Sequence, residues 1–120
     1  QLGWDWFSLH LNNGSKVMLF KVRHASGKDF LSGSWINQDG TKKSLNASEI
    51  ELEETAYSTV NGRRIPTKWK ISLLGRNDLT INTEALNTHS WMDTNFPYWE
   101  GPISFSGDLS GVGYLEMTGY

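Results

Sequence analysis

Short runs of alternating apolar and polar residues, separated by turns that contain glycine, are the feature that most restricts how this chain can fold. The clearest case is the last hairpin, in which residues 98–106 and 112–120 flank a turn at 107–111. Alternation with a period of two is typical of β-strands, because successive side chains point to opposite faces of a sheet. Glycines at both ends of the turn favour an antiparallel hairpin.

Seven further runs alternate in the same way and are expected to be strands. They cover residues 4–11, 16–24, 30–37, 41–45, 49–54, 67–73 and 79–85, and turns are expected at Asn61-Gly62 and at residues 76–78. The run 49–54 would also suit a helix capped by Ser48, but the two-residue spacing of Ile50 and Leu52 favours a strand. The pattern predicts an all-β fold, either a sandwich or an antiparallel up-and-down barrel of about eight to nine strands. Consecutive hairpins favour the barrel, which leaves no exposed edge.

One run departs from simple alternation. Residues 17–20 are apolar on both faces, which predicts a central strand covered on both sides.

The chain has six tryptophans, which suit cores, pockets and interfaces alike. Trp35 and Trp69 lie in the middle of runs and are expected in the core. The tryptophans near strand starts are expected at a pocket rim, and these are Trp4, Trp6 and Trp99.

Glu100 and Glu116 are the first candidates for catalytic chemistry, because each shares a strand face with a tyrosine, Tyr98 or Tyr114. If the hairpin places the two glutamates opposite each other, their carboxyl groups lie roughly 5–8 Å apart. Inside a half-apolar barrel such a pair would hold one proton donor and one acceptor. The alternative is a pair of solvated glutamates outside the sheet, and a slip of one residue would separate them.

Other reactive groups are sparse. His89 lies in the loosest stretch, residues 86–97, where it is expected either at the barrel mouth as a base or on the plain surface. The three histidines are far apart and there is no cysteine, so no metal site, disulfide or cysteine nucleophile is expected. The sequence has neither a Gly-x-Ser-x-Gly motif nor a glycine-rich phosphate loop, and no cofactor is expected.

The bulk composition limits the partners. A chain of 120 residues suits one domain, and a net charge of −2 gives no case for nucleic acid or an anionic membrane. No apolar run approaches the ~18–20 residues needed to span a bilayer. The chain begins at Gln1, without an initiator methionine, almost directly in a strand-like run. We expect it to be part of a longer protein whose targeting segment lies upstream.

Three blocks carry a resemblance to a known family: GWDWFSL at residues 3–9, YWEG at 98–101 and GYLEMTGY at 113–120. In this order they resemble the carboxy-terminal half of AttH-like proteins, the lipocalin-like "predicted secreted hydrolases" related to carotenoid 1,2-hydratase. The resemblance covers the whole chain. The matched positions of interest are Trp6, Trp99, Glu100, Tyr114 and Glu116.

The resemblance implies two consecutive lipocalin-like barrel domains, of which residues 1–120 would form the second. It further implies a periplasmic or secreted protein, behind a signal peptide or a lipoprotein signal, that contacts membrane only through an upstream lipid anchor. The upstream domain is then a partner, and a site can lie between the two domains. The hydratase branch adds water to an isoprenoid double bond by proton transfer without an obligatory cofactor. No motif here supports the hydrolase label.

Three functions are therefore expected. The first is binding of an apolar or amphiphilic small molecule in a bacterial envelope compartment. Its candidate contacts are Trp4, Trp6, Tyr98, Trp99 and His89. The second is a hydratase, isomerase or cyclase acting on an isoprenoid-like substrate. Its candidate catalytic residues are Glu100, Glu116 and Tyr114, with aromatic faces stabilising a developing cation. The third is a structural domain that packs on the upstream domain through exposed tryptophans.

Overall fold

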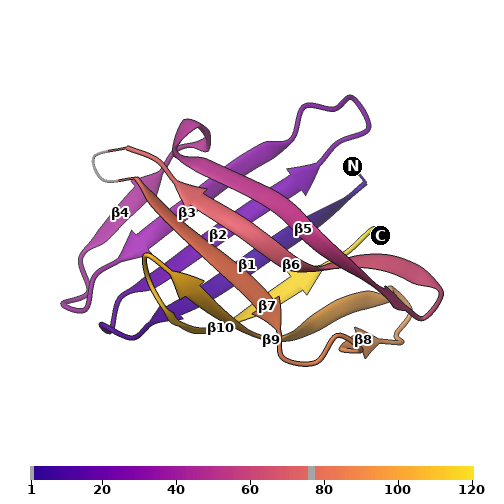
Figure 1. Cartoon of the computed structure of the whole chain (residues 1–120). Coiled ribbons are helices and arrows are strands. Elements are labelled where there is room, and N and C mark those ends of the chain that lie inside the picture. The colour runs from indigo at the N-terminus through magenta and orange to yellow at the C-terminus, as the bar shows by residue number, and fades with distance from the viewer. Residues whose placement is uncertain (1, 76–77) are drawn as a thin grey trace.

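Ten β-strands make up nearly all the regular structure of the computed structural model, which describes residues 2–75 and 78–120 (Figure 1). The strands are β1 (Gly3–Leu11), β2 (Lys16–Arg23), β3 (Phe30–Ile36), β4 (Lys42–Leu45), β5 (Ile50–Val60), β6 (Arg63–Leu73), β7 (Leu79–Ala85), β8 (Trp91–Met92), β9 (Tyr98–Gly107) and β10 (Gly111–Met117). A three-residue 3-10 helix, η1 (Ala47–Glu49), joins β4 to β5. No helix in the described residues is long and apolar enough to cross a membrane.

The predicted all-β fold is confirmed, and each predicted strand corresponds to an observed one, whereas the short β8 lies in the stretch 86–97 and was not predicted. The run 49–54 is a strand, as its two-residue spacing indicated, and it continues to Val60 as β5. The turn at Asn61-Gly62 is present, with Asn61 in the left-handed region at φ 50°. The turn predicted at 76–78 falls mainly on residues 76 and 77, which lie outside the described residues.

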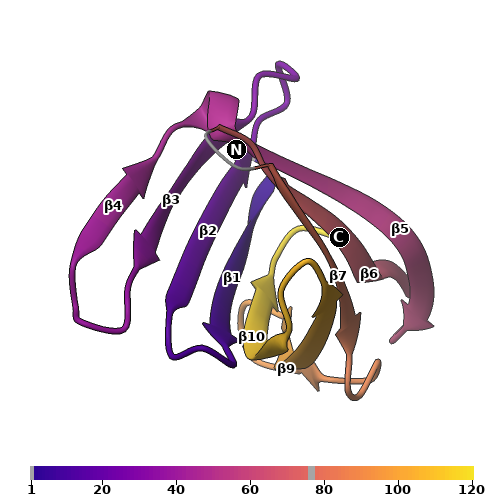
Figure 2. The ribbon, with the colours of Figure 1, turned by 60° about the vertical axis from the view of Figure 1, so that its left-hand side comes forward.

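The strands form one antiparallel sheet in the order β4-β3-β2-β1-β10-β9-β7-β6-β5, with the short β8 paired to β9. The first strand pairs with the last, as expected for a barrel. Between β4 and β5 the described residues show no ladder. Figure 2 shows the result: β4-β3-β2-β1 and β5-β6-β7 face each other as two flanks of a curled half-barrel that is open along one side.

The core fills the space between the two flanks. Alternate residues of each strand point inward, and Phe7 of β1 and Trp69 of β6 are both 0% exposed. Their rings meet edge to face, with centroids 5.2 Å apart and planes at 85°. The predicted core position of Trp69 is confirmed. Because β1 and β6 lie far apart in the sheet order, this contact joins the flanks through the interior.

Glycine at position 33 allows β5 to approach β3 near the open side. A Cβ atom there would lie 2.9 Å from Leu19 Cδ2 and 3.2 Å from Ile50 Cδ1. The connection that leads to Ile50 is held by η1, where Glu49 Oε1 accepts a hydrogen bond of 2.9 Å from the Asn46 backbone N–H. The two flanks therefore touch at this point although no ladder joins their edges.

Replacing Phe7 by alanine is expected to lower the free energy of unfolding by about 3–5 kcal/mol, because it removes the ring that joins the flanks and leaves a cavity. Urea unfolding followed by tryptophan fluorescence measures this loss. Ser8→Ala, on the outward face of the same strand, is the control and should change stability by no more than about 0.5 kcal/mol. Equal effects of the two changes would contradict the role given to Phe7.

Candidate functional site

A pocket of about 490 Å³ opens between the two flanks at the side where the sheet does not close. Its lining residues are Trp35, Asn37, Lys43, Leu45, Glu49, Leu73, Leu74 and Leu79. They come from β3, β4 and η1 on one side and from the end of β6 and the start of β7 on the other. The volume lies in the range of ordinary small-molecule sites.

Strand register explains why these side chains meet. Trp35 of β3 pairs with Lys43 of β4, so both point inward. Across the opening, Leu73 pairs with Leu79 at the β6–β7 hairpin. Because β4 ends at Leu45 and the chain then leaves through η1, no strand among the described residues covers this part of the interior.

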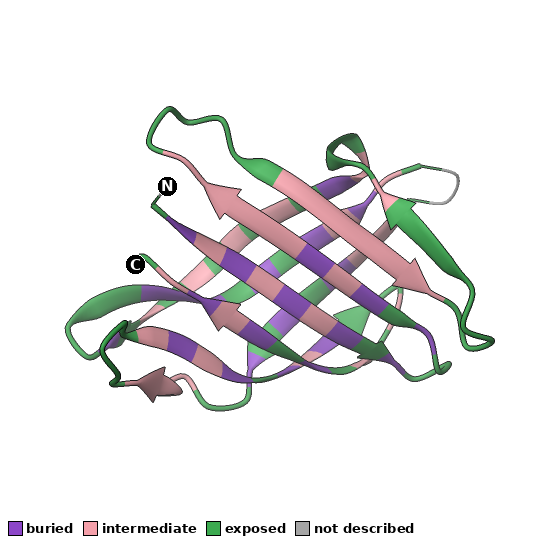
Figure 3. Cartoon of the chain, turned by 180° about the vertical axis from the view of Figure 1, so that it is seen from behind, coloured by how far each residue is buried: buried purple, intermediate pink, exposed green. Residues whose placement is uncertain are grey.

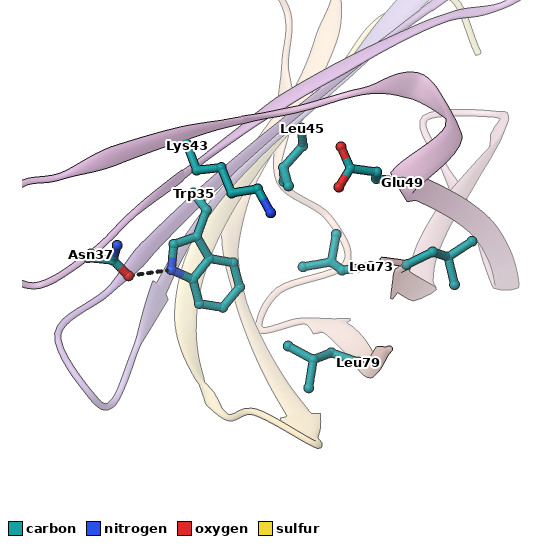
Figure 4. A pocket seen from close by; sticks show the side chains of 8 residues that line it. Trp35, Asn37, Lys43, Leu45, Glu49, Leu73 and Leu79 are labelled. Atoms are coloured by element: carbon teal, nitrogen blue, oxygen red, sulfur yellow. Dashed lines mark hydrogen bonds between the residues drawn. The ribbon is translucent and has the colours of Figure 1, made fainter. Parts of the chain in front are cut away.

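The pocket combines an apolar wall with two charged groups. Figure 4 shows Lys43 extending beside the indole of Trp35, whereas Glu49 lies on the other side of Leu45. The indole N–H of Trp35 donates a 3.0 Å hydrogen bond to Asn37 Oδ1, which orients the ring. The site therefore offers leucine side chains and one aromatic ring to an apolar body, with an ammonium and a carboxylate beside them.

A buried polar cluster around Asp5 lies near the chain termini. The Asp5 side chain is 0% exposed, and Tyr120 donates its hydroxyl proton to Oδ1 at 2.8 Å. Arg23 donates from Nε to Oδ2 at 3.3 Å, and its guanidinium carbon lies 4.0 Å from the centre of the Tyr120 ring. Burial raises the pKa of Asp5 to about 6, against the opposing effects of the Arg23 charge and the Tyr120 hydrogen bond. Burial, and then the Asp5 charge, raise the pKa of Tyr120.

The structure brings the two predicted glutamates together but places them outside the barrel. Glu100 and Glu116 are directly opposite each other in the β9–β10 ladder, which is the first of the two predicted registers. Their strand neighbours Gly101 and Leu115 are the buried, inward-facing residues. Of the two alternatives that the sequence left open, the structure shows the pair on the outside of the sheet and not in the interior, because period-two alternation gives the inner face to the apolar set.

Aromatic donors surround the two carboxylates on this outer face. The indole N–H of Trp4 donates to Glu116 Oε2 at 3.0 Å, and the Tyr98 hydroxyl donates to Glu100 Oε2 at 3.3 Å. The Glu100 charge raises the pKa of Tyr98. Tyr114 lies on the same face and is 39% exposed. A shallow groove follows this face, lined by Trp4, Trp6, Phe20, Val22, Ser32 and Glu116.

Two predicted ligand contacts lie elsewhere. Trp99 is 0% exposed and donates its indole N–H to Thr88 O at 2.9 Å, so it belongs to the core and not to a pocket rim. The reason is again alternation, because Trp99 shares the inward face with Ile103. His89 is exposed in the loop before β8 and does not line the pocket.

Sequence analysis missed the pocket residue Trp35 by assigning it to the core. Trp35 packs against the core but is only half-buried, and it also lines the pocket. The available signal was the next run, residues 41–45, which is short and contains Lys42 and Lys43. A short run with two lysines is typical of an exposed sheet edge, beside which a tryptophan is less fully buried. Within residues 2–75 and 78–120 no group of three His, Cys, Asp or Glu side chains is placed to hold a metal ion.

Comparison with known proteins gives one family and two similar folds. A family model described as AttH-like matches residues 1–120. The crystal structure of an AttH protein from Nitrosomonas europaea superposes with a TM-score of 0.87 at 23% identity, covering 99% of this chain and 39% of that one. The crystal structure of kievitone hydratase from Nectria haematococca superposes with a TM-score of 0.81 at 18% identity, covering 98% of this chain and 39% of that one. These likenesses show the fold. No curated protein matches.

The buried Asp5 carboxyl should make stability depend on pH in a defined direction. Its pKa of about 6 in the folded chain lies above the value of about 4 expected after unfolding. The folded state therefore binds the Asp5 proton more tightly than the unfolded state does. The protonated carboxyl group stabilises the fold fully below about pH 4, and this contribution is lost as the pH rises through about 6. Relative to the Asp5→Asn variant, the wild type should lose up to roughly 3 kcal/mol over this range.

Urea unfolding of both proteins at pH 4, 5, 6 and 7 measures this difference. Comparison with Asp5→Asn cancels the contributions of the other carboxyl groups, which titrate in both proteins. A difference in unfolding free energy that stays constant from pH 4 to pH 7 would show that the pKa of Asp5 is not raised.

Proposed function

The chain belongs to the AttH-like family, and from this premise we propose that it is a binding module for an apolar or amphiphilic small molecule. The observation that carries the proposal is the pocket of about 490 Å³ at the open side of the half-barrel. It is concave, it is lined mainly by leucines and an indole ring, and it has only a few polar groups, as small-molecule sites usually do.

The charged groups of the pocket suit a molecule with one polar end. Lys43 and Glu49 lie beside the apolar wall, so a ligand that buries a hydrocarbon body against Leu45, Leu73 and Leu79 can leave its head near either charge. Each leucine-sized group removed from water contributes about 1.5–3 kcal/mol. Three such contacts contribute about 4.5–9 kcal/mol before the cost of association, so micromolar binding also requires burial of the rest of the ligand against Trp35 and Leu74. Residence in the bacterial envelope stays a prediction that follows from the family resemblance.

The change Leu79→Gln tests the pocket, because it replaces part of the apolar wall by an amide of similar size. We expect the dissociation constant of the fluorescent apolar probe N-phenyl-1-naphthylamine to rise about tenfold, in line with the loss of roughly 1.5 kcal/mol of apolar burial. Val112→Gln is the matched control, because Val112 is 59% exposed on the outer face of β10. Equal affinities of the wild type and Leu79→Gln for the probe would contradict the proposed site.

A second candidate function is proton transfer at Asp5, as in a hydratase. A carboxyl group whose pKa is near 6 can hold or release a proton close to neutral pH. One protein of similar fold is, by its name, a hydratase, and this chain spans 39% of its length. Tyr120 covers Asp5, so a substrate would have to take the place of the phenol ring. The catalytic roles of Glu100, Glu116 and Tyr114 stay predictions.

Water addition to an unsaturated isoprenoid alcohol such as geraniol, followed by gas chromatography, tests this candidate. Asp5→Asn should lower the rate at least about 100-fold, because the amide cannot deliver a proton. Glu100→Gln and Glu116→Gln, assayed beside it, separate the buried carboxyl from the outer pair. An unchanged rate in Asp5→Asn, or no turnover by the wild type, would remove Asp5 proton transfer on this substrate class from consideration.

A further inference from the structure

The polar groups that line the pocket at the open side of the half-barrel differ in the bonds that they already make. Asn37 uses both ends of its amide. Its Oδ1 accepts a hydrogen bond of 3.0 Å from the Trp35 indole, and its Nδ2 donates one of 3.0 Å to Thr41 Oγ1. The Asn37 side chain therefore holds the indole ring and the turn between β3 and β4.

The carboxylate of Glu49 is also committed to the fold. Its Oε1 accepts the hydrogen bond of the Asn46 backbone N–H at 2.9 Å, at the start of η1. The backbone carbonyl of Glu49 accepts a second bond of 2.8 Å from the N–H of Leu74, which joins η1 to the end of β6 across the pocket rim. A ligand head that bound at Glu49 would therefore compete with a contact that shapes the pocket.

Lys43 is the charged group of the pocket that remains available to a ligand. Within residues 2–75 and 78–120 its ammonium forms no ion pair. Lys43 is opposite Trp35 in the β3–β4 ladder, so both side chains lie on the same face. Figure 4 shows the ammonium end on the pocket side, between the indole of Trp35 and Leu45. The pocket thus presents one unpaired positive charge beside its aromatic wall.

This charge lies at the water side of the pocket, whereas the apolar wall lies deeper. Figure 3 shows β4 as an exposed strand, and its exposed residues include Lys42 and Lys43. Across the opening, Leu73 is only 7% exposed. Lysine side chains commonly lay their methylene stem on apolar surface and keep the ammonium in water. A ligand that matches this arrangement has its head at the β4 edge and its hydrocarbon end toward Leu73.

We propose that the ligand of this pocket is a fatty acid whose carboxylate pairs with Lys43. The inference rests on the proposed function, because it names the ligand class of the same pocket. The volume of about 490 Å³ lies in the lower half of the range of roughly 300–1,000 Å³ found for small-molecule sites. It suits one hydrocarbon chain better than the two chains of a membrane lipid.

The number of donors favours a carboxylate over other heads. Among the described lining residues Lys43 is the only lysine or arginine, so one positive charge is available. A phosphate head carries more charge and more acceptor oxygens than one ammonium can satisfy. A cationic head would be repelled by Lys43 and would have to displace Asn46 from Glu49. One monoanionic carboxylate matches the single ammonium.

Displacement of N-phenyl-1-naphthylamine by dodecanoate at low ionic strength tests the inference. Lys43→Gln should raise the dissociation constant of dodecanoate about fivefold, as expected for the loss of one partly solvated ion pair. The dissociation constant of the uncharged probe should stay within about twofold of the wild-type value. Lys43→Arg keeps the charge and should retain the wild-type affinity for dodecanoate. Lys42→Gln is the matched control, because it removes the same charge from a residue that does not line the pocket.

The possible failures of the two proposals can be told apart. An unchanged dodecanoate affinity in Lys43→Gln, or an equal loss in Lys42→Gln, would overturn the pairing with Lys43 and leave the apolar pocket in place. Tighter binding of dodecyl phosphate or dodecyltrimethylammonium than of dodecanoate would overturn the choice of a carboxylate head. A probe that binds the wild type and Leu79→Gln equally would instead remove the pocket itself, and the fatty-acid assignment with it.

Discussion

The antiparallel pairing of β1 with β10 is the constraint on which the other features of this protein depend. It joins the ends of the chain, from Asp5 opposite Met117 to Leu11 opposite Gly111. The approach is close enough to require glycine at position 113, where a Cβ atom would lie 2.3 Å from the carbonyl oxygen of Ser8. Inward, this ladder supplies Phe7 to the core. Outward, it brings Trp4 to Glu116, and at its end it brings Tyr120 to Asp5.

The pocket exists because this regular pairing stops on the opposite side of the sheet. β4 has only four residues and is mostly exposed, and the chain passes through η1 to β5 without forming a ladder between the two strands. A closed barrel of this size either fills its interior with side chains or encloses room for one small ligand. Here the core is filled where β1 meets β6, through Phe7 and Trp69, and remains open where Trp35 faces Leu79. Packing and binding are therefore served by different parts of one interior.

Much of the fold could be read from local patterns, whereas the assignment of side chains to sites could not. The strands, the turns at Asn61-Gly62 and 107–111, and the core position of Trp69 followed from alternation and turn chemistry. The two faces of the last hairpin were also separated correctly. The apolar face of that hairpin is the inner one, and the polar face with Glu100 and Glu116 lies outside. Asp5 went unnoticed, although it shares the inward face of its strand with Phe7 and Leu9; its polar partners Arg23 and Tyr120 are distant in sequence.

The sequence by itself determined most of the strands, the antiparallel pairing of strands joined by short turns and the two-sided character of each strand, because these depend on spacing and turn residues within a few positions. It also determined the membership in the AttH-like family, through blocks that match along the whole chain. Only the tertiary structure decided where the sheet stays open, that Trp35 lines a pocket, and that Arg23 and Tyr120 surround the carboxyl group of Asp5. These outcomes depend on the curl of the whole sheet, which brings residues from opposite ends of the chain together.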